Sequence, residues 1–164
     1  MISITANNHT VLSALNRLAY SLTPSAMRPV MMEIGEELAA STTERFKTGM
    51  APDGSRWPAI SDATLLSRLR KGNSSTKPLV DTGALSDPTL NGPRYQIIDG
   101  GAGVVVGVNR NFGGANASVH QFGTSRAGRN RTVTIPARPF LGLSAQDERT
   151  VLDIIERFFD DQIG

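Results

Sequence analysis

The chain has 164 residues, of which 39% are hydrophobic and 20% are charged, and its formal net charge is +2. These values fit one globular domain with a single core, and the mild charge is not that of a dedicated nucleic-acid binder. The absence of cysteine excludes disulfides, thiolate metal sites and cysteine nucleophiles. Neither a signal-peptide pattern nor an apolar run of roughly 18 residues occurs, so we expect folding in the cytoplasm and no membrane contact.

Two helices are predicted in the first third of the chain, because apolar residues recur there at helical spacing. The first lies in a helical segment at residues 1–24, and the second runs over about residues 26–47. Proline fits a helix at its first turn, so Pro29 is expected near the start of the second helix. Gly49 is expected to cap its end.

A turn and a short helix are expected next. Pro52-Asp53-Gly54 has turn chemistry and precedes the single tryptophan, Trp57. For Trp57 we favour a place in the core over a binding role at an interface. A short helix is expected over residues 61–70, and the polar stretch 71–78 is expected to be a flexible loop.

The clearest hairpin joins two β-rich stretches, residues 95–99 and 103–108, through a turn rich in glycine. Residues 109–131 are expected to form mainly flexible loops, because glycine, asparagine and arginine dominate them. A further strand is expected over residues 132–135. Pro136 should end it, because proline lacks the N–H that a strand ladder needs.

The last predicted element is a helix with an apolar face. Ser144 precedes Asp147 by three residues, in the arrangement of a capping box. The whole pattern predicts one α+β domain over residues 1–164. In it, a small antiparallel sheet packs with the long helix and the C-terminal helix, and long loops connect them.

No catalytic, cofactor or metal site can be assembled from the residue types that usually build one. The two histidines, His9 and His120, have no metal-ligand spacing around them, and no Gly-x-Ser-x-Gly motif occurs. His120 stands between apolar residues, which favours a structural role; a hydrolase that uses His120 is the alternative. Asp53 lacks the further ligands of a calcium loop. We therefore predict no enzyme activity, no cofactor and no metal.

Positive charge gathers in two places. Four arginines lie within residues 124–138 with no acidic residue among them: Arg126, Arg129, Arg131 and Arg138. Arg68, Arg70 and Lys71 form a second cluster. The arginines either form a solvated loop or contact an acidic partner surface or DNA phosphates. Arg138 has a planar guanidinium that suits a carboxylate, either in another subunit or in its own chain.

Five motifs occur in an order that resembles the phage virion morphogenesis family, which includes tail completion proteins of Mu-like phages. They extend from Ile34 to the C-terminal helix. In chain order they are Ile34-Gly35 with Phe46; Pro52-Asp53-Gly54 with Trp57-Pro58; Ser61 and Thr64, then Leu79 with Thr82-Gly83 and Leu85; His120-Gln121-Phe122-Gly123; and Ile135-Pro136-Ala137-Arg138-Pro139-Phe140-Leu141-Gly142-Leu143-Ser144.

This resemblance implies a structural protein of the virion. It would act at the head–tail junction, or neck, where it completes the tail and joins it to the head connector. A homo-oligomeric ring is expected, with six subunits because of tail symmetry, and with other neck and tail proteins as partners. DNA would pass through its lumen. A stopper that seals the portal and a basic-loop DNA-binding module are the alternatives.

The resemblance and the charge pattern together predict two groups of site residues. The expected interface residues are Arg126, Arg129, Arg131, Arg138 and Trp57. The expected structural motif residues are Pro52, Asp53, Gly54, His120, Phe122, Gly123, Pro136, Pro139 and Phe140.

Overall fold

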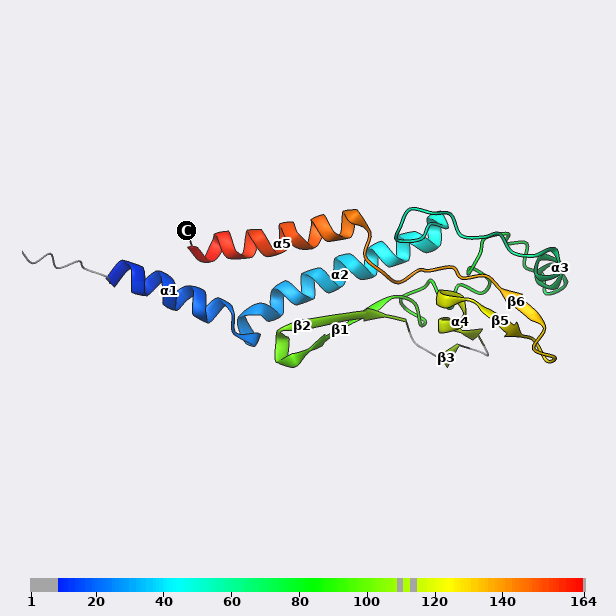
Figure 1. The fold of residues 1–164 in the computed structure, drawn as a ribbon, viewed down its shortest axis with the longest axis horizontal. Coiled ribbons are helices and arrows are strands. Elements are labelled where there is room, and N and C mark those ends of the chain that lie inside the picture. Colours follow the sequence, from blue (N-terminus) through cyan, green and yellow to red (C-terminus); the bar gives the residue numbers. More distant parts are fainter. Residues whose placement is uncertain (1–8, 109–110, 113–114, 164) are drawn as a thin grey trace, which may run out of the picture.

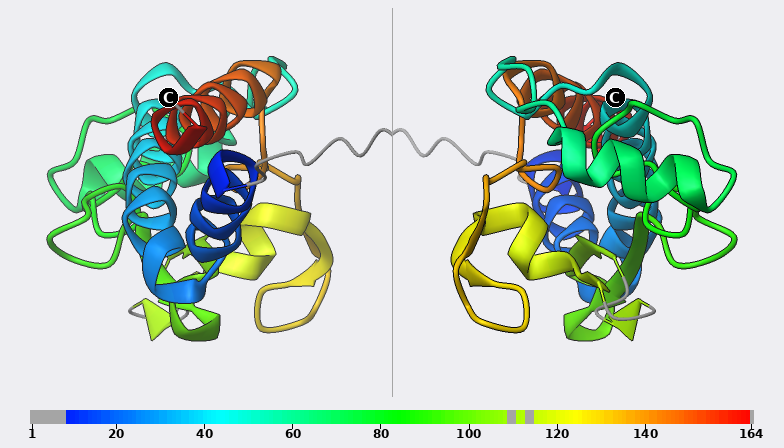
Figure 2. Two further views of the ribbon diagram at one scale, coloured as in Figure 1. Left: turned by 90° about the vertical axis from the view of Figure 1, so that its left-hand side faces the viewer. Right: turned by 90° about the vertical axis from the view of Figure 1, so that its right-hand side faces the viewer.

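The computed structural model describes residues 9–108, 111–112 and 115–163. Its long axis follows helix α2 (Pro24–Thr48), and helix α5 (Ala145–Ile163) lies beside α2 (Figure 1). The end-on views show the helices gathered around this axis (Figure 2). The described part of the domain is therefore elongated, with two ends that differ in their elements.

Both predicted N-terminal helices are present. Helix α1 (His9–Ser21) precedes α2, and Thr23 caps α2 by accepting a hydrogen bond from the Ala26 amide. Helix α2 starts two residues earlier than predicted, because Pro24 occupies its first turn, so Pro29 lies inside the helix and not at its start. Gly49 ends the helix in the left-handed conformation, as predicted, with φ of 72°.

Helix α3 (Asp62–Arg70) lies at the far end of the molecule from α1 (Figure 1). Ser61 caps it by accepting a hydrogen bond from the Thr64 amide at 3.3 Å. The following residues, 71–78, have an irregular backbone. Arg68 Nη1 donates to the carbonyl oxygens of Ser75 and Lys77 at 2.9 and 2.8 Å, so a buried side chain ties this loop to α3.

The predicted hairpin is confirmed. Strands β1 (Arg94–Ile98) and β2 (Gly103–Gly107) pair antiparallel, and a 3-10 turn, η1 (Asp99–Gly101), joins them. A Cβ atom added at Gly101 would lie 2.2 Å from the carbonyl oxygen of Pro24. The turn therefore needs glycine to pack against the start of α2.

The prediction of flexible loops over residues 109–131 is wrong for most of the part that the structure describes. Helix α4 (Ala117–Phe122) follows a short pair of strands, β3 (Asn111–Phe112) and β4 (Ala115–Asn116). Strand β5 (Thr124–Ala127) then pairs with β6 (Val133–Ile135). Positive φ angles at Gly128 and Arg131, 78° and 54°, reverse the chain between them. Residues 109–110 and 113–114 lie outside the described residues.

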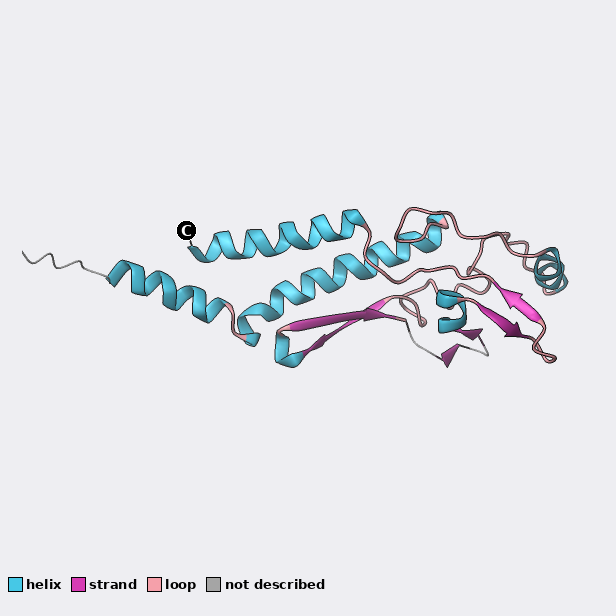
Figure 3. Ribbon diagram, in the orientation of Figure 1, coloured by secondary structure: helices cyan, strands magenta, loops and turns pink. Residues whose placement is uncertain are grey.

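The predicted α+β class is confirmed (Figure 3). Among the described residues, the strands form three separate antiparallel pairs and not one sheet. Two clusters of buried side chains lie along α2. One joins α2 to α5 through Val30, Ile34 and Ile154. The other, which we call the Phe140 junction, consists of Phe46, Ala51, Trp57, Ala117 and Phe140.

Candidate functional site

The turn at Pro52-Asp53-Gly54 is built as predicted. The Asp53 carboxylate accepts hydrogen bonds from the amide and hydroxyl of Ser55 at 2.9 and 2.7 Å, and these bonds lower the pKa of Asp53. Gly54 has a φ of 82°, which favours glycine. Pro52 packs on Gly142, where an added Cβ atom would lie 2.9 Å from the proline ring. The turn thus holds the end of α2 against the segment that precedes α5.

Trp57 lies in the core, as the sequence favoured, and is 6% exposed. Its indole Nε1 donates to the carbonyl oxygen of Pro139 at 2.7 Å, and its ring meets that of Phe46 edge-on with centroids 5.5 Å apart. Phe140 is fully buried, and its ring centroid lies 5.3 Å from that of Phe46. Trp57 therefore serves the packing of the chain.

The segment after β6 is held by side chains, because its prolines prevent a regular ladder. Gln121 Oε1 accepts from the amides of Phe140 and Leu141, both at 3.0 Å, and Gln121 Nε2 donates to the Leu141 carbonyl at 2.9 Å. Arg45 Nη1 donates to the carbonyl oxygens of Phe140 and Gly142 at 2.9 and 2.8 Å. Two side chains from distant helices thus replace the missing strand partner.

Arg45 also forms a buried ion pair with Asp147, whose side chain is 7% exposed. Burial lowers the pKa of Arg45, and Asp147 partly offsets this effect. Burial alone would raise the pKa of Asp147, but hydrogen bonds from Ser41 and Ser144 and the charge of Arg45 bring it below the ordinary value. Asp147 also completes the predicted capping box with Ser144. The pair fixes α5 to α2.

Arg138 is placed differently from either predicted alternative. It is 6% exposed, and its guanidinium donates to the carbonyl oxygens of Pro58 and Ala59 at 2.7 and 2.8 Å. The partners are thus backbone carbonyls and not a carboxylate of its own chain. Because the side chain is enclosed by its own domain, the expected pairing with another subunit is also not supported.

The motif His120-Gln121-Phe122-Gly123 divides between the interior and the surface. The His120 carbonyl accepts a hydrogen bond from the Arg138 amide at 2.7 Å. At Gly123, where φ is 71°, an added Cβ atom would lie 2.7 Å from the Ala137 amide nitrogen. Phe122 is 78% exposed, so its predicted structural role does not include packing in the core. The other three residues join α4 to the segment after β6.

The His120 ring stands half-buried at the edge of a cavity. Its Nδ1 atom is buried without a hydrogen-bond partner among the described residues. Burial lowers the pKa of His120, and the charge of Arg138 lowers it further, so the ring is neutral at pH 7. A catalytic histidine of the serine-hydrolase type needs an orienting partner on this nitrogen. Among the described residues, none supplies the orienting partner that the hydrolase alternative would need at this nitrogen.

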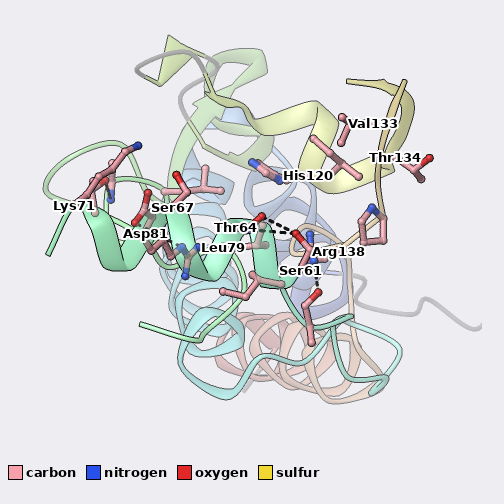
Figure 4. A pocket seen from close by; sticks show the side chains of 18 residues that line it. Ser61, Thr64, Ser67, Lys71, Leu79, Asp81, His120, Val133, Thr134 and Arg138 are labelled. Atoms are coloured by element: carbon pink, nitrogen blue, oxygen red, sulfur yellow. Dashed lines mark hydrogen bonds and ion pairs between the residues drawn. The ribbon is translucent and has the colours of Figure 1, made fainter. Parts of the chain in front are cut away.

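The cavity itself has a volume of about 740 Å³ and lies between α3, residues 79–85 and β6. Figure 4 shows Thr64 and Ser67 of α3 and its capping residue Ser61 along the cavity, together with His120 and Arg138. The lining also includes apolar side chains, namely Ile60, Leu79, Leu85, Val133 and Ile135, and the proline Pro136. It is an apolar hollow with a cationic edge, and several of the family-like motifs meet there.

The remaining predicted interface residues lie together. Arg126, Arg129 and Arg131 are all exposed and lie on β5 and the turn between β5 and β6. Their role at an interface stays a prediction. The sequence did not reveal Gln121 or Arg45 as key residues, because their partners lie 19 or more positions away in the chain.

The described ranges contain neither a candidate metal site nor a helix that could span a membrane. No group of three or more His, Asp or Glu side chains there could hold a metal ion. None of the described helices is long and apolar enough to cross a membrane. The motif residues that the fold brings together instead join α2, α4 and α5, so they define a structural domain with an apolar cavity at one end.

Comparison with known proteins identifies the class. The model of the phage virion morphogenesis family matches residues 6–160, and the chain belongs to this family. It is also 34% identical over 160 residues to a protein of Haemophilus influenzae named Mu-like prophage FluMu G protein 2, covering 97% of this chain and 96% of that protein. No solved structure matches. These findings give the chain a structural role in the phage virion.

Proposed function

We propose that the chain is a structural protein of the head–tail junction, which completes the tail and joins it to the head connector as a closed ring. One observation carries this proposal beyond the family. Large apolar side chains are exposed at both ends of the elongated domain, including Leu12 and Leu15 in α1 and Leu66 and Leu69 in α3. Exposed apolar groups at separate places suit a subunit with several neighbours.

The arrangement of the motifs supports a structural role and not catalysis. Beside the Phe140 junction, the polar side chains of Gln121 and Arg45 satisfy backbone groups. Such an arrangement makes a rigid body with fixed surfaces. Tail symmetry suggests six copies, made in the cytoplasm of the bacterial host and then built into the virion. Other neck and tail proteins would bind the two faces of the ring.

The exposed arginines favour a second element of this function. Arg126, Arg129 and Arg131 carry three positive charges with no acidic residue among them. In a ring they would face DNA in the lumen or an acidic neighbour. DNA binding by the purified protein that weakens as salt rises would favour contact with phosphates. Unchanged binding after all three are replaced by alanine would exclude these residues from it.

The role at the junction is tested by removing the chain from a phage that encodes it. Host cells infected by a phage with a stop codon in the gene should accumulate filled heads and separate tails. Supplying the chain from a plasmid should restore joined, infectious particles. Normal joined particles without the chain would contradict the proposal.

A further inference from the structure

Helix α1 is an amphipathic helix whose apolar side is largely uncovered. Leu12 and Leu15 are 56% and 55% exposed, and Tyr20 is 66% exposed. A helix of 13 residues is marginal in water by itself, so its stability must come from packing. The elements that contact α1, namely α5 and α2, leave these side chains in solvent. The helix therefore offers an apolar surface to a partner.

The end of α5 continues this surface and adds negative charge. Leu152 on α5 is 56% exposed. The last turns carry Glu156, Asp160 and Asp161, all exposed, while Arg157 is paired with Glu33. The only lysine or arginine of α1 is Arg17. We call α1 and the last turns of α5 the α1–α5 end; it is apolar, with an acidic part.

The opposite end of the molecule has matching properties. There the cavity of about 740 Å³ opens between α3 and β6. Leu66, Leu69 and Val133 are 53%, 50% and 52% exposed. The exposed charges of this end are five cations, Arg70, Lys71, Arg126, Arg129 and Arg131, and two carboxylates, Asp62 and Asp81. We call it the α3–β6 end; it is apolar and hollow, with a basic part. Figure 1 shows that α1 and α3 lie at opposite ends of the long axis.

We propose that copies of this chain bind one another head to tail, with the α1–α5 end of one copy docked on the α3–β6 end of the next. The leucines of α1 enter the cavity, and the acidic turns of α5 lie near the arginines of the β5–β6 turn. This inference rests on the proposed ring and names the surfaces that form it. A contact between two different surfaces is heterologous, and it closes into a ring when the rotation per subunit allows.

Charge favours this contact over a symmetric one. Pairing two α1–α5 ends would bring Glu156, Asp160 and Asp161 of both copies together. Pairing two α3–β6 ends would bring their arginines together. Like charges across an interface oppose association, whereas the head-to-tail contact places opposite charges together. The occupant of the cavity is therefore a second copy, held through α1.

The natural chain has no cysteine, so single cysteines can report the contact. Leu15→Cys and Ser67→Cys, of which Ser67 is exposed and lines the cavity, are made separately, mixed at high concentration and treated with a short bismaleimide. The mixture should give a covalently cross-linked dimer on a denaturing gel, and each variant alone should give no cross-linked product. A protein with both substitutions should give a ladder of cross-linked species that stops at the ring. Val105→Cys is the matched control, because Val105 is 51% exposed on β2, away from both ends.

The outcomes separate the possibilities. Cross-linking of Leu15→Cys with itself would show a symmetric contact and overturn the proposal. Equal yields from the mixture and from Val105→Cys mixed with Ser67→Cys would overturn it as well. Since this test needs no phage, its failure leaves the role at the junction to be judged by the joining of heads and tails.

A charge exchange gives a second readout. Replacing Asp160 and Asp161 by lysine should lower the cross-linking yield several-fold, and replacing Arg129 and Arg131 by glutamate should do the same. When the two exchanged proteins are mixed, the new lysines of one can face the new glutamates of the other. The cross-linking yield between these two ends should then recover. Yields that do not respond to either exchange would contradict the placement of the α5 turns.

Discussion

The Phe140 junction and the two ends of the molecule differ in how far their apolar side chains are buried. At the junction, Phe140 is fully buried, and Gln121 and Arg45 satisfy the backbone around it. At the ends, Leu12 and Leu15 of α1 and Leu66 and Leu69 of α3 are half or more exposed. The side chains of the junction are packed within one chain, whereas the ends leave large apolar side chains in solvent.

This difference shows what the family-like motifs do. Most of their residues stand at the junction or on the cavity that adjoins it, and they hold the domain together. Trp57 and Arg138, both predicted at an interface, are buried there. The surfaces proposed for assembly lie partly in α1, which no motif marks. Recognisable motifs thus identify the fold more reliably than the contacts between subunits.

The largest effect is expected from Asp147→Ala. The substitution leaves the Arg45 guanidinium buried without its carboxylate, and breaking one side of a buried pair costs about 3–5 kcal/mol. Urea unfolding followed by circular dichroism measures this loss. Replacing both residues by apolar ones, Arg45→Met with Asp147→Leu, should restore part of it. A loss below about 1 kcal/mol for Asp147→Ala would mean that the pair does not hold α5 to α2.

Gln121→Ala should have a smaller effect. It leaves two amides and one carbonyl of residues 140 and 141 without their partner. Because these bonds are only partly buried, water replaces some of them, and the expected total loss is about 1–3 kcal/mol. Gln146→Ala is the matched control, because Gln146 is exposed on α5 and should change stability by less than about 0.5 kcal/mol. Equal effects of the two substitutions would contradict the role given to Gln121.

The stability of the domain should fall as the pH is lowered through the range in which histidine titrates. Because burial lowers the pKa of His120, the unfolded chain binds a proton that the folded chain does not. The stability that comes from keeping His120 neutral is fully present above the unfolded pKa of about 6.5. As the pH falls below that value, the free energy of unfolding decreases by at most about 1.4 kcal/mol per pH unit. His120→Asn should remove this slope between pH 7 and 5. His9→Asn should keep it, and a slope that survives His120→Asn would have another source.

Substitutions at the ends should leave stability unchanged and instead impair assembly. Leu15→Ser replaces an exposed leucine, so the free energy of unfolding should change by no more than about 0.5 kcal/mol. The same substitution should reduce the joining of heads and tails in a complementation assay. A variant that folds and joins normally would show that the exposed leucine has no partner in the virion.

The sequence predicted α1, α2, α3 and α5 because their apolar spacing and caps are local signals, as at Ser61 and Ser144, but it missed the short helix α4. It also predicted the first hairpin from its glycine-rich turn. It missed β5, because the stretch around Arg126 lacks alternation and its pairing depends on the turn at Gly128. The capping box marked Asp147, but its second partner, Arg45, lies 102 residues away. Contacts over such separations leave no pattern in a single sequence.

Imaging of intact virions tests the central claim most directly. Reconstruction of the neck of a phage that carries this chain should show it as a closed ring between the head connector and the tail, with α1 of each copy against α3 of the next. Density for the chain elsewhere in the particle, or a neck without it, would contradict the proposed role.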